Sequence, residues 1–231
     1  MLNVANLDFY YGESHALWDL ALEIPSGSCT CLMGRNGVGK TTLLKNIMGL
    51  LKPKNGVIEF DGEDLTNRPP ELRAAKGIGY VPQGREIFPL LSVEENLRTG
   101  LIARSDGQRR IPEIVFDCFP GLKEMLDRRG GDLSGGQQQQ LAIGRALVID
   151  PKFVILDEPT EGIQPNIVQF IGDTIEMLNQ ELGLTVLLVE QKLYFAQRLA
   201  DRFAIMEKGR IIANGALSDL TDELVKKSLS V

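Results

Sequence analysis

A lysine and a threonine, Lys40 and Thr41, follow a stretch in which Gly34 and Gly39 are separated by four residues. This is the phosphate-loop pattern, and it lies where that motif requires, between an apolar run at 29–33 and a helical pattern. Glycines let successive backbone N–H groups point into one concavity, and the positive end of the helix favours an anion there. Lys40 adds a charge for the outer phosphates, and Thr41 offers a hydroxyl to Mg²⁺. A glycine-rich turn that binds nothing is the competing interpretation, which the strand–loop–helix context disfavours.

Two carboxylates, Asp157 and Glu158, end a second apolar run. The carboxyl ends of strands are where open α/β sheets bind ligands. Asp157 can hold Mg²⁺ through water, opposite Thr41, while Glu158 can orient and polarise a water for in-line attack on a γ-phosphate. Gln83, at the end of a strand predicted at 77–82, can join the same water and metal shell. A solvated strand end is the alternative, and the phosphate loop makes it the weaker one.

A second helix start with anion-binding character lies at Ser134, which is followed by Gly135 and Gly136. Serine is a favoured helix cap, and two glycines at a capped start leave backbone N–H groups accessible to an anion. The glutamine run 137–140 falls inside the amphipathic pattern that continues to residue 147, so we interpret it as a polar helix face.

The order of elements predicts an α/β fold. Alternation at 2–9 and 16–24 indicates an antiparallel sheet. The apolar run that precedes the two carboxylates, and a second apolar run that ends at residue 189, each indicate a buried strand. Residues 92–149 are helical in pattern, with breaks at Pro112 and Pro120. We therefore expect one domain over residues 1–231, in which a helical subdomain at about 92–149 is inserted into a core made of 1–91 and 150–231.

Tyr10 and Tyr11 end the first predicted strand, where an exposed aromatic ring can stack on adenine. Ordinary strand packing explains either tyrosine equally well. The single histidine, His15, has no ligand cluster nearby and is expected to be a surface residue.

Composition sets broad limits on function. A net charge of −6 over 231 residues argues against a nucleic-acid surface, which usually carries a basic excess. Three cysteines are expected to be reduced thiols, with Cys29 and Cys31 on opposite faces of one strand. Neither a signal peptide nor an apolar run long enough to span a bilayer is visible, which favours a cytosolic chain.

These motifs together make the whole chain resemble the ATP-binding subunit of an ABC transporter. Residues 34–42 resemble that family's Walker A loop, 153–158 its Walker B strand, and Leu-Ser-Gly-Gly-Gln at 133–137 its signature. The resemblance implies a P-loop NTPase core with a mostly parallel sheet, an N-terminal antiparallel β subdomain and an inserted helical subdomain. It also implies ATP hydrolysis with ATP and Mg²⁺ as cofactors.

The resemblance assigns roles residue by residue. It implies ATP binding by Tyr11, Gly34, Arg35, Asn36, Gly37, Val38, Gly39, Lys40, Thr41 and Thr42. It implies catalysis by Glu158, Gln83 and Gln191, and Mg²⁺ binding by Thr41, Gln83 and Asp157. It implies contact with a partner's ATP by Leu133, Ser134, Gly135, Gly136 and Gln137.

The same resemblance implies partners. Two such subunits, identical or different, associate head to tail, so that each ATP lies between one subunit's phosphate loop and the other's signature. The dimer drives transmembrane permease subunits and is linked indirectly to a solute-binding protein, with no role for nucleic acid. The resemblance also implies that the subunit is a peripheral protein on the cytoplasmic face of the cell membrane.

Two departures from the family pattern indicate a particular branch of the ABC transporter family. Gln191 occupies a position that is usually histidine, and Gln164 one that is usually aspartate. Both changes occur in the branch that imports branched-chain amino acids and amides. The motif loops resemble most closely the second ATPase subunit of urea importers, with branched-chain amino acids or short amides as alternative solutes. Because an amide can donate a hydrogen bond but carries no proton, this site could also be mainly a binding and gating half-site.

Two further interpretations stay open. Arg85, Glu86 and Phe88, directly after Gln83, either contact a membrane subunit or pack against the helical subdomain. An alternative to the transport function is that of an ABC ATPase in DNA repair or translation. Proteins of that class normally carry a second nucleotide domain or a long coiled coil.

Overall fold

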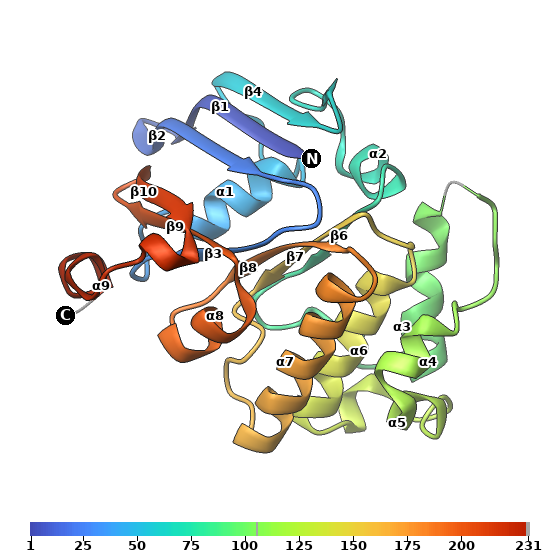
Figure 1. Cartoon of the computed structure of the whole chain (residues 1–231). Helices are drawn as coiled ribbons and strands as arrows, with labels where there is room; N and C mark the ends of the chain where they lie inside the picture. Colours follow the sequence, from blue (N-terminus) through green and yellow to red (C-terminus); the bar gives the residue numbers. More distant parts are fainter. Residues whose placement is uncertain (105, 230–231) are drawn as a thin grey trace.

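The computed structural model describes residues 1–104 and 106–229, so residue 105 and residues 230–231 of the expected domain lie outside it. The described chain builds two sheets, one of four strands in the order β2-β1-β4-β5 and one of six in the order β10-β9-β3-β8-β7-β6. Figure 1 shows the smaller sheet and α1 on one side of the six-stranded sheet, with α6 and α7 on the other. The mixed α/β fold with an antiparallel and a mostly parallel sheet is confirmed.

The antiparallel sheet comprises β1 (Leu2–Tyr11), β2 (Ser14–Ile24), β4 (Asn55–Phe60) and β5 (Glu63–Asp64). Its apolar residues join α1 (Lys40–Ile47) in one core, to which Phe153 and Ile155 of the larger sheet also belong. This packing fixes the smaller sheet against α1, the helix that follows the phosphate loop.

Four neighbouring strands of the larger sheet run in parallel: β3 (Cys29–Met33), β8 (Thr185–Val189), β7 (Phe153–Asp157) and β6 (Ile78–Val81), the last of which lies at the edge. β9 (Arg202–Glu207) continues the sheet parallel to β3, and β10 (Arg210–Ala216) is antiparallel to β9. Strands β3, β7 and β8 are buried along their whole length, which explains their unbroken apolar runs. Their carboxyl ends form a single edge.

The expectation that Cys29 and Cys31 face opposite sides of the sheet is wrong. Both belong to the core on the α6 and α7 side, because residues two apart in a strand share a face. Both are buried free thiols, as is Cys118, and burial raises the pKa of Cys29 to about 12.

Helices cover the second face of the larger sheet. The segment after β6 contains α3 (Val93–Gly100), α4 (Ile114–Cys118), α5 (Pro120–Lys123) and α6 (Gly135–Leu147), with 3₁₀ turns at Leu101–Ala103 and Gly130–Asp132. α7 (Pro165–Gln180) and α8 (Leu193–Leu199) follow, and the chain ends with a 3₁₀ turn at Leu217–Asp219 and α9 (Asp222–Leu229). The proposed subdomain boundaries stay a prediction. Within the described ranges, no helix combines the length and apolarity that crossing a bilayer demands.

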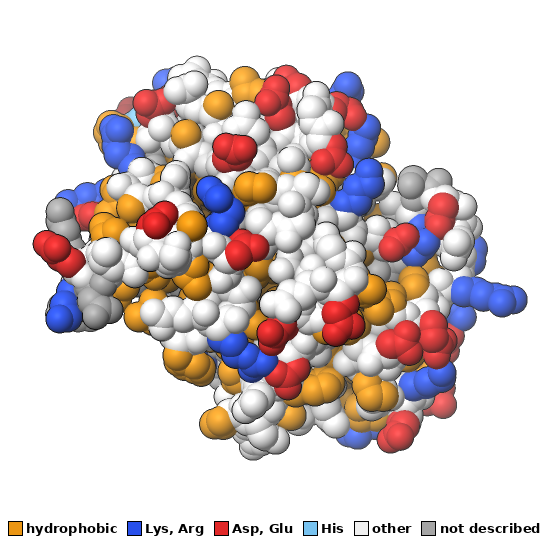
Figure 2. Space-filling view, in the orientation of Figure 1, with side chains coloured by type: hydrophobic (Ala, Val, Ile, Leu, Met, Phe, Trp, Pro, Cys, Tyr) orange, Lys and Arg blue, Asp and Glu red, His pale blue; other side chains and the backbone are white. Residues whose placement is uncertain are grey.

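Charged side chains of both signs are spread over the surface. Figure 2 shows acidic and basic groups interspersed on the face that it presents, with apolar side chains between them. A nucleic-acid surface instead gathers its basic residues on one face or stripe. The distribution on this face therefore agrees with the net negative charge in giving no support to nucleic-acid binding there.

A buried arginine connects α2 (Pro70–Ala75) to the core. The Arg73 guanidinium is 1% exposed and donates hydrogen bonds to five backbone carbonyl oxygens, two of them at the end of α1. A cation at the carbonyl end of a helix satisfies acceptors that have no partner within that helix.

Candidate nucleotide site

The phosphate loop runs from the end of β3 to the start of α1. Gly34 has φ 156°, and a Cβ there would lie 2.5 Å from the carbonyl oxygen of Met206. Gly39 has φ 111° and is the residue directly before α1. Any side chain at either position would clash or be strained, so both glycines are required by this backbone path.

Lys40 is buried at the first turn of α1. Its ammonium donates hydrogen bonds to the carbonyl oxygens of Gly34, at 2.7 Å, and Arg35, at 3.0 Å. Burial lowers its pKa, and the nearby carboxylates of Glu158 and Asp157 oppose that shift. The lysine therefore lies across the phosphate loop, with Glu158 Oε1 4.0 Å from its nitrogen.

Asp157 ends β7 and is buried, and Thr41 donates a hydrogen bond of 3.3 Å to its Oδ2. Burial raises the pKa of Asp157 to about 6, against the effects of the Thr41 hydrogen bond and the charge of Lys40. A buried carboxylate beside a hydroxyl is an oxygen donor set that fits Mg²⁺, whose charge would offset the desolvation.

Glu158 lies at the centre of a polar cluster. Its Oε1 accepts a hydrogen bond of 2.6 Å from Gln191 Nε2, and its Oε2 is 3.4 Å from Gln83 Nε2. Gln191 Nε2 is also 2.8 Å from Asn36 Oδ1 in the phosphate loop. The structure thus brings together predicted site residues from the ends of β6, β7 and β8 and from the loop after β3.

Tyr11 borders the same site. It is 51% exposed, its hydroxyl is 3.4 Å from Thr42 Oγ1, and it lines a cavity of about 580 Å³ with the phosphate loop, Gln83 and Glu158. Tyr10 instead stacks on His15 at 4.0 Å. The geometry therefore favours Tyr11 as the stacking residue of the predicted pair.

His15 is not the surface residue that we expected. Its side chain is 13% exposed, is stacked between Tyr10 and Trp18, and lies 2.9 Å from Asp8 Oδ1. Trp18 lies three residues from His15 on the same strand, β2, whereas the β1–β2 pairing brings Tyr10 and Asp8 to it.

The signature residues lie elsewhere. Ser134 caps α6: its Oγ accepts from the Gln137 N–H at 3.3 Å, and Gln137 Oε1 accepts from the Ser134 N–H at 2.9 Å. Residues 133–137 do not line the cavity beside Lys40, and Figure 1 shows α6 on the opposite side of the sheet from α1. Contact with ATP through these residues would require the site of a second subunit, which stays a prediction.

Comparison with known proteins decides the family. Residues 17–161 match the family model described as ABC transporter. This chain belongs to the ABC transporter family.

Two curated relatives resemble this ABC cassette over most of its length. The high-affinity branched-chain amino acid transport ATP-binding protein BraG of Pseudomonas aeruginosa is 43% identical over 213 residues, which cover 92% of this chain and 91% of that protein. The probable branched-chain amino acid transport ATP-binding protein LivF of Archaeoglobus fulgidus is 38% identical, over 96% of this chain and 94% of that protein.

Solved structures agree on the fold. A nucleotide-free ATP-binding cassette from an ABC transporter superposes with a TM-score of 0.82 at 30% identity, covering 100% of this chain and 95% of that one. The dimeric post-hydrolysis state of the cassette MJ0796, bound to ADP and Pi, gives a TM-score of 0.81 at 28% identity, over 94% and 99%. This chain is therefore an ATP-binding cassette of an ATPase family.

The structure of this ABC cassette adds a residue that the sequence analysis missed. Glu161 Oε2 accepts a hydrogen bond of 2.9 Å from Gln83 Nε2, which is shorter than the bond from Gln83 to Glu158. Its position three residues after Glu158 in an acidic loop was the available signal. Gln83 therefore joins two carboxylates rather than one.

Arg85 in this ABC cassette packs toward the helices. Its guanidinium lies 3.2 Å from Gln139 Oε1, 3.4 Å from Gln138 Oε1 and 3.3 Å from the carbonyl oxygen of Glu161. These contacts favour packing against the helical segment for Arg85. Phe88, by contrast, is 47% exposed and lines a surface cavity of about 650 Å³, so it stays a candidate for contact with a membrane subunit.

Proposed function

We propose that this chain is the ATP-hydrolysing subunit of an ABC importer for a small polar solute, either a branched-chain amino acid or an amide such as urea. The observation that carries the proposal is the position of Glu158, 4.0 Å from Lys40 and hydrogen-bonded to Gln191 at the carboxyl edge of the parallel sheet. A carboxylate at that place can accept the proton of an attacking water, while Lys40 stabilises charge on the transferred phosphoryl group.

Each remaining residue has a part in the proposed mechanism. Thr41, Gln83 and Asp157 would hold Mg²⁺, which supplies charge neutralisation at the phosphate oxygens. Gln191 donates a hydrogen bond and cannot take a proton, so it orients Glu158 and can reach the γ-phosphate only as a donor. Glu158 is therefore left as the proton acceptor among the side chains of this cluster.

The assembly we propose is a head-to-tail dimer, of two copies or with a second cassette. In it Ser134, Gly135 and Gly136 would contact the ATP of the partner through the capped start of α6. One solved neighbour, the bacterial cassette MJ0796, is a dimer, and both curated relatives are named as transport ATP-binding proteins. We infer permease subunits and a solute-binding protein as further partners, and a peripheral place on the cytoplasmic side of the membrane.

The solute is a finer part of the proposal. Two relatives are named for branched-chain amino acid transport, which supports that class. Urea rests on the likeness of the loops at 34–40, 81–88 and 157–165 alone, and stays a prediction. No contact with the solute during its passage across the membrane is expected in this chain, since the solute crosses through the permease subunits.

Reconstitution would test the proposal. The chain is purified with its permease subunits in proteoliposomes, and phosphate release is measured with the solute-binding protein loaded with leucine or with urea. We expect stimulation by one of the two solutes. Copurification with nucleic acid rather than membrane proteins, together with hydrolysis that no solute system stimulates, would instead indicate the DNA-repair or translation class.

A second candidate function, favoured by the amide at Gln191, is that the site of this subunit mainly binds nucleotide and gates the dimer while the partner cassette hydrolyses faster. Replacement of Lys40 by alanine here, and of the matching lysine in the partner cassette, separates the two roles. If this site mainly gates, the replacement in the partner abolishes more hydrolysis; equal losses exclude the asymmetry.

A further inference from the structure

A second cavity lies at the edge of the sheet opposite the nucleotide site. Its lining includes Ser26 before β3, Lys152 before β7 and Leu184 before β8, whereas the phosphate loop and Glu158 follow the carboxyl ends of these strands. The cavity has a volume of about 480 Å³, within the usual range for small-molecule sites. Nothing in the proposed hydrolytic mechanism uses it.

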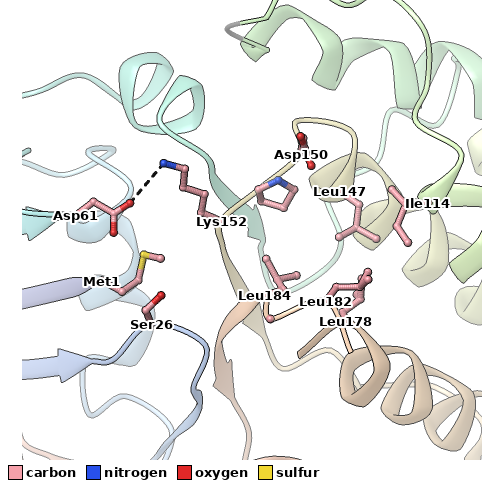
Figure 3. A pocket seen from close by; sticks show the side chains of 12 residues that line it. Met1, Ser26, Asp61, Ile114, Leu147, Asp150, Lys152, Leu178, Leu182 and Leu184 are labelled. Atoms are coloured by element: carbon pink, nitrogen blue, oxygen red, sulfur yellow. Dashed lines mark ion pairs between the residues drawn. The ribbon is translucent and has the colours of Figure 1, made fainter. Parts of the chain in front are cut away.

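The two sides of this cavity differ in chemistry. Figure 3 shows Asp61 and Lys152 on one side, with Asp150 above, and aliphatic side chains on the other. The aliphatic wall consists of Ile114, Leu147, Leu178, Leu182 and Leu184. A ligand that fills the cavity must therefore combine charge at one end with a branched apolar group at the other.

The charged side can bind both signs. Lys152 Nζ lies 3.6 Å from Asp61 Oδ2, longer than a hydrogen bond, so its N–H donors are available to a ligand carboxylate. Asp61 and Asp150 can accept from a ligand ammonium.

Other ligand classes fit less well. Among the described residues that line the cavity none is aromatic, so a nucleobase would find no ring on which to stack. Urea would leave the leucine wall without an apolar partner. A zwitterion with a branched aliphatic side chain satisfies both sides.

Three parts of the fold meet here. Asp61 follows β4 of the antiparallel sheet, Leu178 belongs to α7 on the parallel sheet, and Leu147 is the last residue of α6, whose first turn carries the signature. A ligand in contact with all three would resist their relative movement.

We propose that this cavity binds a free aliphatic α-amino acid, of the class that the importer delivers, and that binding slows ATP hydrolysis. The identity of the ligand as transported solute rests on the proposed function, whereas the binding chemistry rests on the cavity. The ligand carboxylate contacts Lys152, its ammonium contacts Asp61 or Asp150, and its side chain packs on Leu182 and its neighbours.

Methyl NMR of the full chain titrated with L-leucine tests the binding directly. We expect saturable shifts in the leucine wall at millimolar ligand and none with L-glutamate. Leu182→Asn and Lys152→Gln should each weaken binding by about tenfold, or about 1.4 kcal/mol. Leu182 is 56% exposed, so the asparagine is tolerated in the fold, and Leu50→Asn, at a site 53% exposed outside the cavity, is its matched control. Lys123→Gln, another exposed lysine in an ion pair, is the control for Lys152.

The ATPase of the reconstituted importer supplies the second measurement. Leucine on the nucleotide side should lower the rate several-fold, and Leu182→Asn should remove that effect while the rate without leucine is unchanged.

Absence of saturable shifts, or equal weakening by the control variants, overturns the site. Saturable binding without any change in rate overturns the regulation. If transport shows urea to be the solute and leucine still binds, only the proposed solute fails; if amino acids are transported and leucine does not bind, only this inference fails.

Discussion

Replacement of Glu158 by glutamine separates catalysis from nucleotide binding. The change conserves size and keeps an oxygen that can accept the 2.6 Å hydrogen bond from Gln191, but it removes the proposed proton acceptor. A positioned general base contributes roughly 10²–10⁴-fold to a rate. At about 1.4 kcal/mol for each tenfold, the barrier should rise by about 3–5 kcal/mol.

Nucleotide binding should survive the same change. The Lys40 ammonium is held by the carbonyl oxygens of Gly34 and Arg35, which the substitution does not touch, and it loses only a carboxylate at 4.0 Å. Phosphate release by the reconstituted importer and binding of a fluorescent ATP analogue by the chain are the two measurements. The expected pattern is a large loss in kcat with little change in Kd.

Glu161→Gln is the matched control. Glu161 accepts a shorter hydrogen bond from Gln83 than Glu158 does. Among the described residues, however, Lys40 forms its ion pair with Glu158 and not with Glu161. We expect it to reduce kcat less than tenfold, since it would orient Gln83 without accepting the proton. Unchanged hydrolysis in Glu158→Gln, or an equal loss in both variants, would refute the assignment of the proton acceptor.

Three further predictions concern stability and reactivity. Arg73→Met should lower the free energy of unfolding by about 3–5 kcal/mol in urea denaturation, because five backbone carbonyls lose a buried donor. Without nucleotide and metal, the contribution of Asp157 to stability should be smaller at pH 7 than at pH 4, because burial raises the pKa of this carboxyl to about 6 from 3.8. The proton-bound folded state is thus favoured at low pH, and this stabilisation, about 3 kcal/mol at most, is lost as pH rises through 6; thermal melts of Asp157→Asn should lack this component. Cys29, Cys31 and Cys118 should stay unreactive toward a thiol reagent until unfolding, because burial raises all three pKa values.

The sequence predicts those parts of the site that depend on local chain geometry. The loop at 34–42 and the pair Asp157 and Glu158 each combine a buried strand with a fixed number of following residues, so period and spacing suffice. The Ser134 cap is equally local, since donor and acceptor lie three residues apart.

Contacts between distant segments escaped the same reasoning. His15 is largely covered because strand pairing places Tyr10 on the ring face opposite Trp18, and a pattern along one strand cannot reveal that contact. Arg73 looks like an ordinary surface arginine in a short helix, yet it binds carbonyls 26 and 27 residues away. The error over Cys31 was of another kind, because residues two apart in a strand point the same way.

The side-chain amide of Gln191 connects two parts of the site by hydrogen bonds. A histidine at that position could share a proton with Glu158, whereas glutamine can only donate or accept hydrogen bonds. Its Nε2 lies 2.6 Å from Glu158 Oε1 and 2.8 Å from Asn36 Oδ1, so one amide connects the end of β8 to the end of β7 and to the phosphate loop. We therefore expect a movement of the phosphate loop to break the Gln191–Asn36 hydrogen bond or to shift the amide that also contacts Glu158. If Glu158 is the proton acceptor, as we propose, its orientation should then depend on the position of the phosphate loop through Gln191, whose amide cannot take a proton.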